Sequence, residues 1–300
     1  MNNKGFISTT IVYSFFLVFL LILLYIVSDL VNNRILINAL DDEIKNEISD
    51  DNFGRYLTIN ADDLGLVKHD STLTNGSLDN SLRYVGSNPN NYICFGSEVS
   101  PCPSENLYRI IGVFNNQLKI IKNTAYGSNR NFDSLNSNYY VSSDMHEYLN
   151  TVFLNSILSP WNELIATHVW YVGGIDNTFT NSNVYDIYTY ELGSEKKASV
   201  YINAKIGLMH ISDYGYAAST NYYASNITGA ANWLNNNQST WFMTRNSSSN
   251  DTQYYLANTG TINIVSVSSS NQVRPTFYLN SSVKIAGGTG TSSDPYRIEV

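Results

Sequence analysis

The residues with the most evident chemistry are the two cysteines, Cys94 and Cys102. Seven residues separate them, including Pro101, and there is no second cysteine pair to complete a zinc ribbon. In an exported domain, this spacing favours a structural disulfide that closes a small loop. A redox-active pair is the alternative, but C-x-x-C spacing and a neighbouring basic cluster are both missing. We therefore predict a disulfide between Cys94 and Cys102.

The histidines and the known catalytic motifs give no support for an enzyme. Four histidines occur singly, without the H-x-x-x-H or H-E-x-x-H spacing of metal sites: His69, His146, His168 and His210. The sequence has neither a G-x-S-x-G nucleophile motif nor a G-x-x-x-x-G-K phosphate loop. The prediction is a protein that is not an enzyme and that uses no metal and no cofactor.

Aromatic side chains supply the remaining candidate contacts. The chain has 23 tyrosines, and five of them lie in the stretches WYVGG and DYGYAASTNYYASN. Tyrosine and tryptophan combine a broad apolar face with a polar group, which suits contact with a sugar or a protein. We take Trp170, Tyr171, Asp213, Tyr214 and Tyr216 as candidate surface contacts, with SDYGY as a surface turn. The alternative is that tyrosine and asparagine replace charged residues in an exported, β-rich domain.

Composition restricts the partners of the chain. Only 14% of the 300 residues are charged, and the net charge is -8. An acidic surface repels phosphate backbones, so we expect no nucleic-acid partner. The length is sufficient for one or two domains, each with an apolar core.

Residues 6–27 form an apolar run without a charged residue. A helix of this length is about 33 Å long and spans a hydrocarbon core of about 30 Å. The run is longer than the apolar part of a cleavable signal, and no small-x-small site follows it. We predict a single-pass anchor in the cell membrane, with the N-terminus cytoplasmic and the C-terminal domain extracellular.

The helical pattern continues beyond the predicted membrane span. Apolar residues recur at steps of three, four and seven up to Ile48, and the SDDNFG cluster with Gly54 provides a helix stop. We therefore assign residues 1–54 to a transmembrane and amphipathic stem helix. The alternative is an amphipathic spacer that lies on the membrane or on the folded domain.

The start of this helix resembles the prepilin segment of type IV pilins and pseudopilins. The resemblance is carried by Lys4, Gly5 and Phe6 before the long apolar helix. It implies a peptidase that cuts after Gly5, a mature N-terminus at Phe6, and other pilin-like subunits as partners. The family usually has a glutamate at the fifth mature position, where this chain has Thr10.

The rest of the chain is expected to divide into a connector and one body. Residues 55–91 are mostly polar and read as a connector with one short strand at most. From residue 92 to 300, LYRIIGVF and LKIIKNTAY predict a hairpin, and later apolar runs predict short strands. The order of hairpin, helices and strands predicts an α+β body that is mainly antiparallel, with one or two helices.

The firmest helix prediction in the body lies between Ser143 and Pro160. Ser143 or Asp144 is suited to cap its N-terminus, and Pro160 prevents its continuation. Its apolar face is expected to contain Met145, Leu149, Val152, Phe153 and Ile157. A shorter helix is expected to start at Pro160 and bury Trp161, Leu164 and Ile165.

Residues 92–300 also resemble an uncharacterised domain of bacterial surface proteins, itself similar to C-type-lectin-like and sulfatase-modifying-factor-like folds. The pattern is carried by LYRIIGVFNNQLKII, IGLMHISDYGYA, WFMTR and VRPTFYLNSSV, and by the closing GGTGTSSDPYRIEV. The calcium motifs of C-type lectins are incomplete, because WNE stands in place of W-N-D and the second motif is absent.

Together these features predict a membrane-anchored, pilin-like extracellular surface protein with a non-catalytic binding or adhesion domain. Its expected partners are the membrane, other pilin-like subunits, and a glycan or a cell-surface protein. One alternative is a minor pseudopilin of a type IV filament or of a secretion or uptake machine. Another is an exported enzyme on a sulfatase-modifying-factor-like scaffold.

Overall fold

The computed structural model describes residues 52–178, 182–192, 201–225, 227 and 231–300, and the single residues Tyr13, Leu20, Val27 and Ser28. Its contacts divide the chain into two units, Met1–Asp50 and Asp51–Val300. Apart from those four residues, the predicted membrane span, the stem up to Ile48 and the Gly5–Phe6 junction lie outside the described residues. No helix within the described part of the chain is both long and apolar enough to cross a bilayer.

The second unit begins well before residue 92. Residues 55–91, predicted as a connector, contribute to helix α2 (Phe53–Ile59) and form helix α3 (Ala61–Leu64) and strands β1 (Leu66–Lys68) and β2 (Leu82–Tyr84). The connector prediction is wrong because Leu57, Leu66, Leu82 and Tyr84 of this polar segment are buried in the core of the unit.

Helix α2 also corrects the predicted helix stop. Gly54 lies inside α2 and not at the end of a preceding helix. The side chain of Asn52 accepts a hydrogen bond from the backbone N–H of Arg55 at 3.0 Å, which caps the N-terminus of α2. The SDDNFG cluster therefore starts a helix at Phe53, and the predicted end of the stem helix lies outside the described residues.

The largest sheet has seven strands, and all of its pairs are antiparallel. The order is β1-β2-β4-β5-β13-β9, with β3 also paired to β4. The further strands are β3 (Tyr92–Cys94), β4 (Leu107–Phe114), β5 (Gln117–Lys122), β9 (Ile206–Gly207) and β13 (Thr276–Tyr278). The predicted hairpin is confirmed as β4 and β5.

The turn of this hairpin explains why it could be predicted. Asn115 and Asn116 have φ angles of 49° and 61°, the left-handed conformation that two-residue hairpin turns require. Asparagine adopts this conformation more easily than most residues do. The pair therefore fixes the register, in which Phe114 lies opposite Gln117.

Three smaller sheets complete the described part of the unit. A four-stranded sheet has the order β12-β11-β10-β7, in which only β10 and β7 are parallel. Strand β6 pairs with β8, and β14 pairs with β15. Their bounds are β6 (His168–Tyr171), β7 (Gly174–Ile175), β8 (Tyr201–Ala204), β10 (Thr240–Asn246), β11 (Thr252–Leu256), β12 (Ile262–Ser266), β14 (Ile285–Gly287) and β15 (Arg297–Ile298). The predicted α+β class with mainly antiparallel sheets is confirmed.

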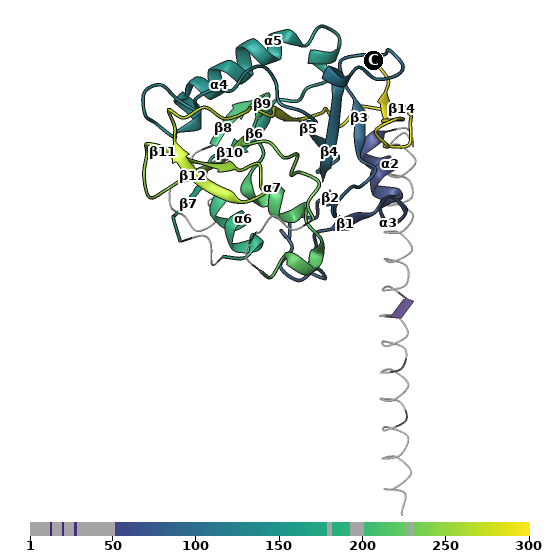
Figure 1. The fold of residues 1–300 in the computed structure, drawn as a ribbon. Coiled ribbons are helices and arrows are strands. Elements are labelled where there is room, and N and C mark those ends of the chain that lie inside the picture. The colour runs from purple at the N-terminus through teal and green to yellow at the C-terminus, as the bar shows by residue number, and fades with distance from the viewer. Residues whose placement is uncertain are drawn as a thin grey trace, which may run out of the picture. The chain divides into compact units, whose positions relative to one another are not determined.

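A helix between residues 144 and 156 runs along one side of the unit (Figure 1). It consists of α4 (Asp144–Tyr148), a π-helical turn (Leu149–Phe153) and α5 (Leu154–Ser156). The Ser143 side chain caps α4 by accepting from the His146 N–H at 3.2 Å, as predicted. Val152 is 52% exposed, contrary to its predicted place on the buried face. The wider π turn changes the direction of side chains along the helix.

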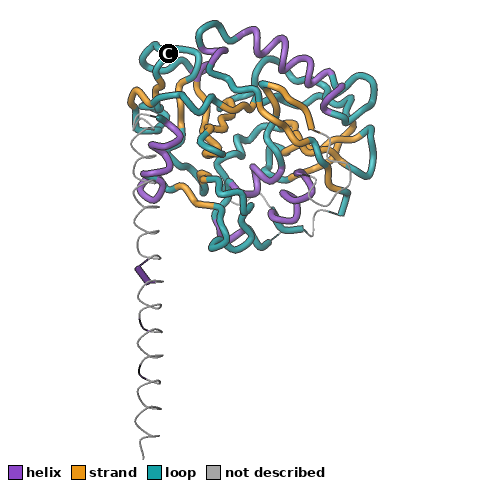
Figure 2. The backbone as a smooth tube through the Cα atoms, turned by 180° about the vertical axis from the view of Figure 1, so that it is seen from behind, coloured by secondary structure: helices purple, strands orange, loops and turns teal. Residues whose placement is uncertain are grey.

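Two further helices, α6 (Val184–Leu192) and α7 (Ile211–Tyr216), lie on the other side of the unit from α4 and α5 in Figure 1. The sequence predicted strand and turn for the residues of α7. Instead, the backbone N–H of His210 donates to the Asp213 carboxylate at 2.9 Å and starts a helix. The tube in Figure 2 shows these short helices around the strands.

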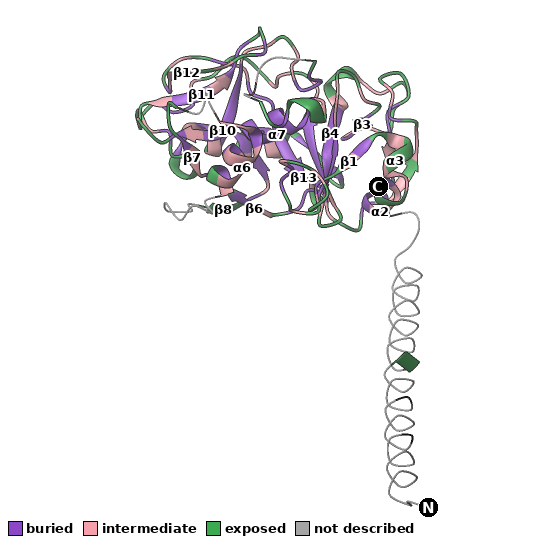
Figure 3. Cartoon of the chain, turned by 90° about the horizontal axis from the view of Figure 1, so that it is seen from below, coloured by how far each residue is buried: buried purple, intermediate pink, exposed green. Residues whose placement is uncertain are grey.

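Strands and the segments between them both contribute buried positions to the core (Figure 3). One aromatic group joins the large sheet to the segment after α5: Phe95 contacts Tyr108, Trp161 and Phe277 with ring centroids 5.2–5.7 Å apart. Burial of Trp161 and Ile165 agrees with the predicted short helix, which is a 3-10 turn (Trp161–Glu163).

The two ends of the second unit are held together. The backbone N–H of Phe53 donates to the carbonyl of Val283 at 2.8 Å, and the ring of Phe53 packs against Tyr296 with centroids 5.2 Å apart. The N–H of Cys94 donates to the carbonyl of Tyr296 at 3.0 Å. The predicted disulfide between Cys94 and Cys102 is present next to this contact.

Candidate functional site

A cavity of about 240 Å³ lies between the large sheet, β6 and helices α6 and α7. Strands β2 and β5 supply its two cations, Arg83 and Lys119, and α7 supplies Asp213. Aromatic residues from β6, α6 and β13 form much of the wall: His168, Trp170, Tyr171, Tyr188 and Tyr278. We call this space the first cavity.

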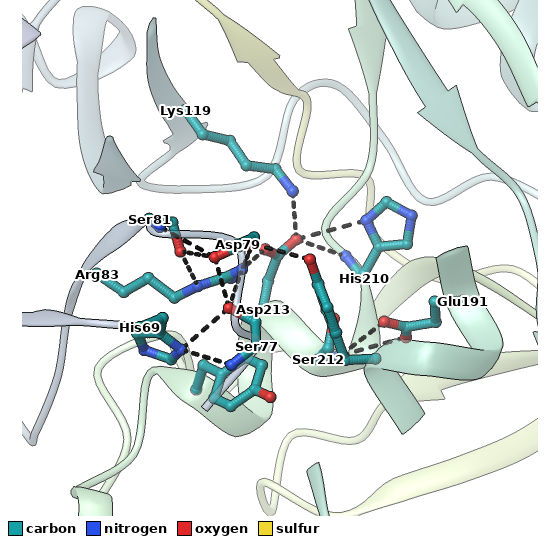
Figure 4. Close-up of polar contacts among 12 residues, drawn as sticks. His69, Ser77, Asp79, Ser81, Arg83, Lys119, Glu191, His210, Ser212 and Asp213 are labelled. Carbon is teal, nitrogen blue, oxygen red and sulfur yellow. Dashed lines mark hydrogen bonds and ion pairs between the residues drawn. The ribbon is translucent and has the colours of Figure 1, made fainter. Parts of the chain in front are cut away.

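Asp213 is at the centre of the charges of the first cavity (Figure 4). Its Oδ2 accepts from Lys119 Nζ at 2.6 Å and from the backbone N–H of His210 at 2.9 Å. Its Oδ1 accepts from a guanidinium nitrogen of Arg83 at 3.3 Å. The side chains of Asp213, Lys119 and Arg83 are each 3% exposed, so water does little to screen these contacts.

The pKa values of this group follow from burial and charge. Burial alone raises the pKa of Asp213, but Lys119, His210 and Arg83 outweigh burial and hold that pKa well below its usual range. Burial lowers the pKa of Lys119, and the Asp213 carboxylate reverses that effect and raises it. All three side chains of this ion-paired group are therefore charged at neutral pH.

A second carboxylate, that of Asp79, completes the charge balance. Its Oδ2 accepts from Arg83 at 3.1 Å and from the Tyr188 hydroxyl at 2.9 Å. Its Oδ1 accepts from the Ser77 hydroxyl at 2.7 Å and from the Ser81 N–H at 3.0 Å. Burial raises the pKa of Asp79, but Arg83 and the serine hydrogen bonds lower it below the usual range. Asp79 is 25% exposed and is therefore the carboxylate of this network that solvent reaches.

Glu191 adds a carboxyl group of a different kind. It lies on α6, is 1% exposed, and accepts from the N–H of Ser212 at 3.2 Å and from the hydroxyl of Thr244. Burial raises the pKa of Glu191, and the nearby His210 with the hydrogen bonds from Ser212 and Thr244 offsets only part of that effect.

The aromatic wall is closely packed around the cations. Lys119 Nζ lies 5.5 Å from the ring centroid of Trp170 and 5.4 Å from that of Tyr278. His168 stacks on Tyr278 with centroids 3.7 Å apart. Burial, with Lys119 and His210 nearby, lowers the pKa of His168 to about 4, so this imidazole is neutral at pH 7.

The arrangement offers hydrogen-bonding groups and ring surfaces, and the charges of its salt-bridged side chains balance. The two cations Arg83 and Lys119 balance the two carboxylates Asp79 and Asp213. In the part of the chain that the structure describes, no group of three His, Cys, Asp or Glu residues is placed to hold a metal ion. The first cavity is therefore suited to a neutral, polar ligand.

Three of the five candidate contact residues, Trp170, Tyr171 and Asp213, line the first cavity. Tyr214 and Tyr216 do not line it. The prediction of surface contacts is wrong for Trp170, Asp213, Tyr214 and Tyr216, which are at most 3% exposed. SDYGY is part of α7 rather than a surface turn, and Tyr214 donates its hydroxyl hydrogen to the Gly260 carbonyl at 2.8 Å.

Tyr171 is the candidate contact residue that reaches solvent, with 38% of its surface exposed. The network also contains residues that sequence reasoning did not select: Asp79, Arg83, Lys119 and Glu191. The sequence did contain one indication of two of these residues. Arg83 and Lys119 interrupt the apolar stretches LRY and LKII, and a charge in a buried strand needs a partner.

Comparison with known proteins adds no relative from which a role could be transferred. No protein-family model, curated protein or solved structure matches the chain. The function is therefore argued from the residues and geometry of this chain.

Proposed function

We propose that this protein is a membrane-anchored, pilin-like extracellular surface protein whose folded unit binds a neutral glycan in the first cavity without catalysis. The apolar run at residues 6–27 supports the anchor. The observation that carries the binding role is the charge-balanced first cavity with its aromatic wall. The proposed location is the cell membrane, with the folded unit outside the cell.

The charge balance of the first cavity supports a neutral ligand over an ion. An anionic ligand would compete with Asp213 for Lys119 and Arg83, and would leave a buried carboxylate unpaired. A cationic ligand would compete in the same way for the carboxylates. A sugar hydroxyl both donates and accepts, so it bonds to Asp79 without displacing an ion pair.

The exposed ring of Tyr171 suits the apolar face of a sugar. Tyr171 is 38% exposed, and its backbone carbonyl accepts from His210 Nε2 at 2.8 Å. That backbone contact is independent of the side chain. A truncated side chain at this position would therefore remove ring surface from the wall and leave the neighbouring hydrogen bond in place.

A glycan array tests the proposal with the full-length chain in detergent. We expect binding to at least one neutral glycan, and Tyr171→Ala to weaken it about tenfold through loss of ring contact. Tyr222→Ala is the matched control, because Tyr222 is 43% exposed and lies outside the cavity wall. No signal on any glycan, or equal loss in both variants, would overturn the proposed glycan binding.

A minor pseudopilin of a filament or of a secretion machine is the second candidate function. The residues that favour it are Lys4, Gly5 and Phe6 ahead of the apolar run. In this case the long N-terminal helix would bind other pilin-like subunits, and the folded unit would be carried on the assembly. The two roles are compatible, because the glycan site and the N-terminal segment use different residues.

A further inference from the structure

A second cavity, of about 560 Å³, lies between the disulfide loop and the helix at residues 144–156. It shares no lining residue with the first cavity. Rings and aliphatic side chains form its apolar wall: Phe95, Tyr108, Tyr126, Phe153, Ile157 and Leu158. Its volume is in the range of small-molecule sites, about 300 to 1,000 Å³.

Lys122 gives this apolar space one buried cation. It stands at the end of β5 and is 5% exposed. Its Nζ donates to the backbone carbonyl of Glu105 and lies 4.9 Å from the ring centroid of Tyr108. An ammonium has three donors, so this single carbonyl does not exhaust its hydrogen-bonding capacity.

Within the described part of the chain, the second cavity lacks the paired carboxylate that Lys119 has in the first cavity. Lys119 is equally buried and is paired with Asp213 at 2.6 Å. Among the described residues, Lys122 forms no salt bridge with a carboxylate. A buried ammonium without a carboxylate in direct contact is costly, and an anion brought by a ligand would relieve that cost.

We infer that the second cavity binds a monocarboxylate with an apolar body, held by its carboxylate at Lys122. The apolar body then lies against Tyr126 and Leu158, the lining side chains that keep accessible apolar surface, and this contact removes the body from water. The charge-assisted hydrogen bond to Lys122 fixes the orientation of the acid. Glu105 also lines this cavity, and its exposed side chain accepts from the Ser104 hydroxyl at 3.3 Å. Burial lowers the pKa of Lys122 to about 8, and the nearby Glu105 charge offsets only part of that effect, so the ammonium still gains from the carboxylate of a ligand.

Calorimetric titration of the full-length protein with decanoate and decanol tests this inference, since the two probes share an apolar chain and differ in charge. We expect decanoate to bind wild type at least tenfold more tightly than it binds Lys122→Met. Methionine keeps the length of the side chain and removes the charge. Decanol is expected to bind both proteins with similar, weak affinity.

Two further variants keep the test decisive. Glu105→Gln removes the exposed negative charge and is expected to tighten decanoate binding about twofold, without a change in the core. Tyr171→Ala, in the first cavity, is expected to leave decanoate binding unchanged, which separates this inference from the glycan proposal. Absence of decanoate binding to wild type, or equal affinity in wild type and Lys122→Met, would overturn the inference.

Discussion

Asp213 links elements that are far apart in the sequence. It is 94 residues from Lys119 and 130 from Arg83, yet its two oxygens contact both cations. The three side chains are buried, so each depends on the others for the electrostatic energy that water no longer provides. This group holds β2, β5 and α7 in the arrangement that shapes the first cavity.

We expect Asp213→Asn to lower the free energy of unfolding at pH 7 by about 3 kcal/mol, because it leaves two buried cations without their shared carboxylate. Urea unfolding monitored by circular dichroism measures the change. A double variant with Lys119→Met removes one of those cations, so it should lose less stability than the sum of the two single changes. If the loss of stability in the double variant equalled the sum of the two single losses, the Asp213–Lys119 ion pair would not stabilise the fold.

The same carboxylate makes stability depend on acid pH. Its pKa is near 3.8 when unfolded and lies well below that value when folded, so the folded state holds Asp213 deprotonated. The stabilisation is complete above about pH 5 and is lost progressively as pH falls below about 4. In Asp213→Asn, the free energy of unfolding should fall less steeply over that range. If the free energy of unfolding changed equally with pH in wild type and in Asp213→Asn, the Asp213 carboxylate would not contribute to the acid dependence.

At the scale of elements, the close approach of β2 to β4 depends on Gly112. A Cβ atom at this position would lie 2.1 Å from the backbone oxygen of Leu82, which is held in the sheet and has little freedom to move. The register of β4 against β5 also shifts between Ile110 and Gly112, as at a β-bulge. Glycine is required here by lack of space and not by a left-handed φ.

Gly112→Ala is therefore expected to destabilise the folded unit by about 2 kcal/mol or more, since either β2 or β4 must move. Thermal unfolding of the full-length protein measures the loss. Asn263→Ala, at an exposed strand position, is the control and should change stability by less than about 0.5 kcal/mol. A melting temperature unchanged in Gly112→Ala would contradict the close packing of these strands.

Elements with a strong local pattern could be predicted from the sequence. The β4–β5 hairpin follows from two apolar runs and an Asn-Asn turn, and the helix at residues 144–156 follows from its cap and spacing. At most one short strand was expected where β1 and β2 lie, because three-residue strands between polar turns have no readable period. Helix α7 was missed because its tyrosines favour a strand locally and its packing favours a helix.

The candidate site was harder to predict than the elements, because its contacts join residues that are far apart in the sequence. The first cavity joins β2, β5, β6, α6, α7 and β13, and its ion pairs span about a third of the chain or more. No local spacing encodes such contacts. Trp170, Tyr171 and Asp213 were selected for their chemistry, and the structure brings all three to the first cavity, although two of them are buried.

At the scale of the whole molecule, the pilin resemblance makes a prediction that does not depend on the folded unit. If a prepilin peptidase acts on the chain, N-terminal sequencing of protein purified from membranes will give Phe6 as the first residue. Gly5→Leu should then leave the chain uncut, because the cleavage site requires the small residue. An intact Met1 or Asn2 in the wild-type protein would contradict the pilin-like part of the proposal.

The contact between the two ends of the second unit has a consequence for how this protein is made. Phe53 is completely buried, and its packing partner Tyr296 lies near the other end of the second unit. A ribosome reaches Tyr296 only after it has synthesised almost every other residue of the unit. Helix α2 therefore cannot complete its packing until Tyr296 has left the ribosome, so this contact forms late in the folding of the unit.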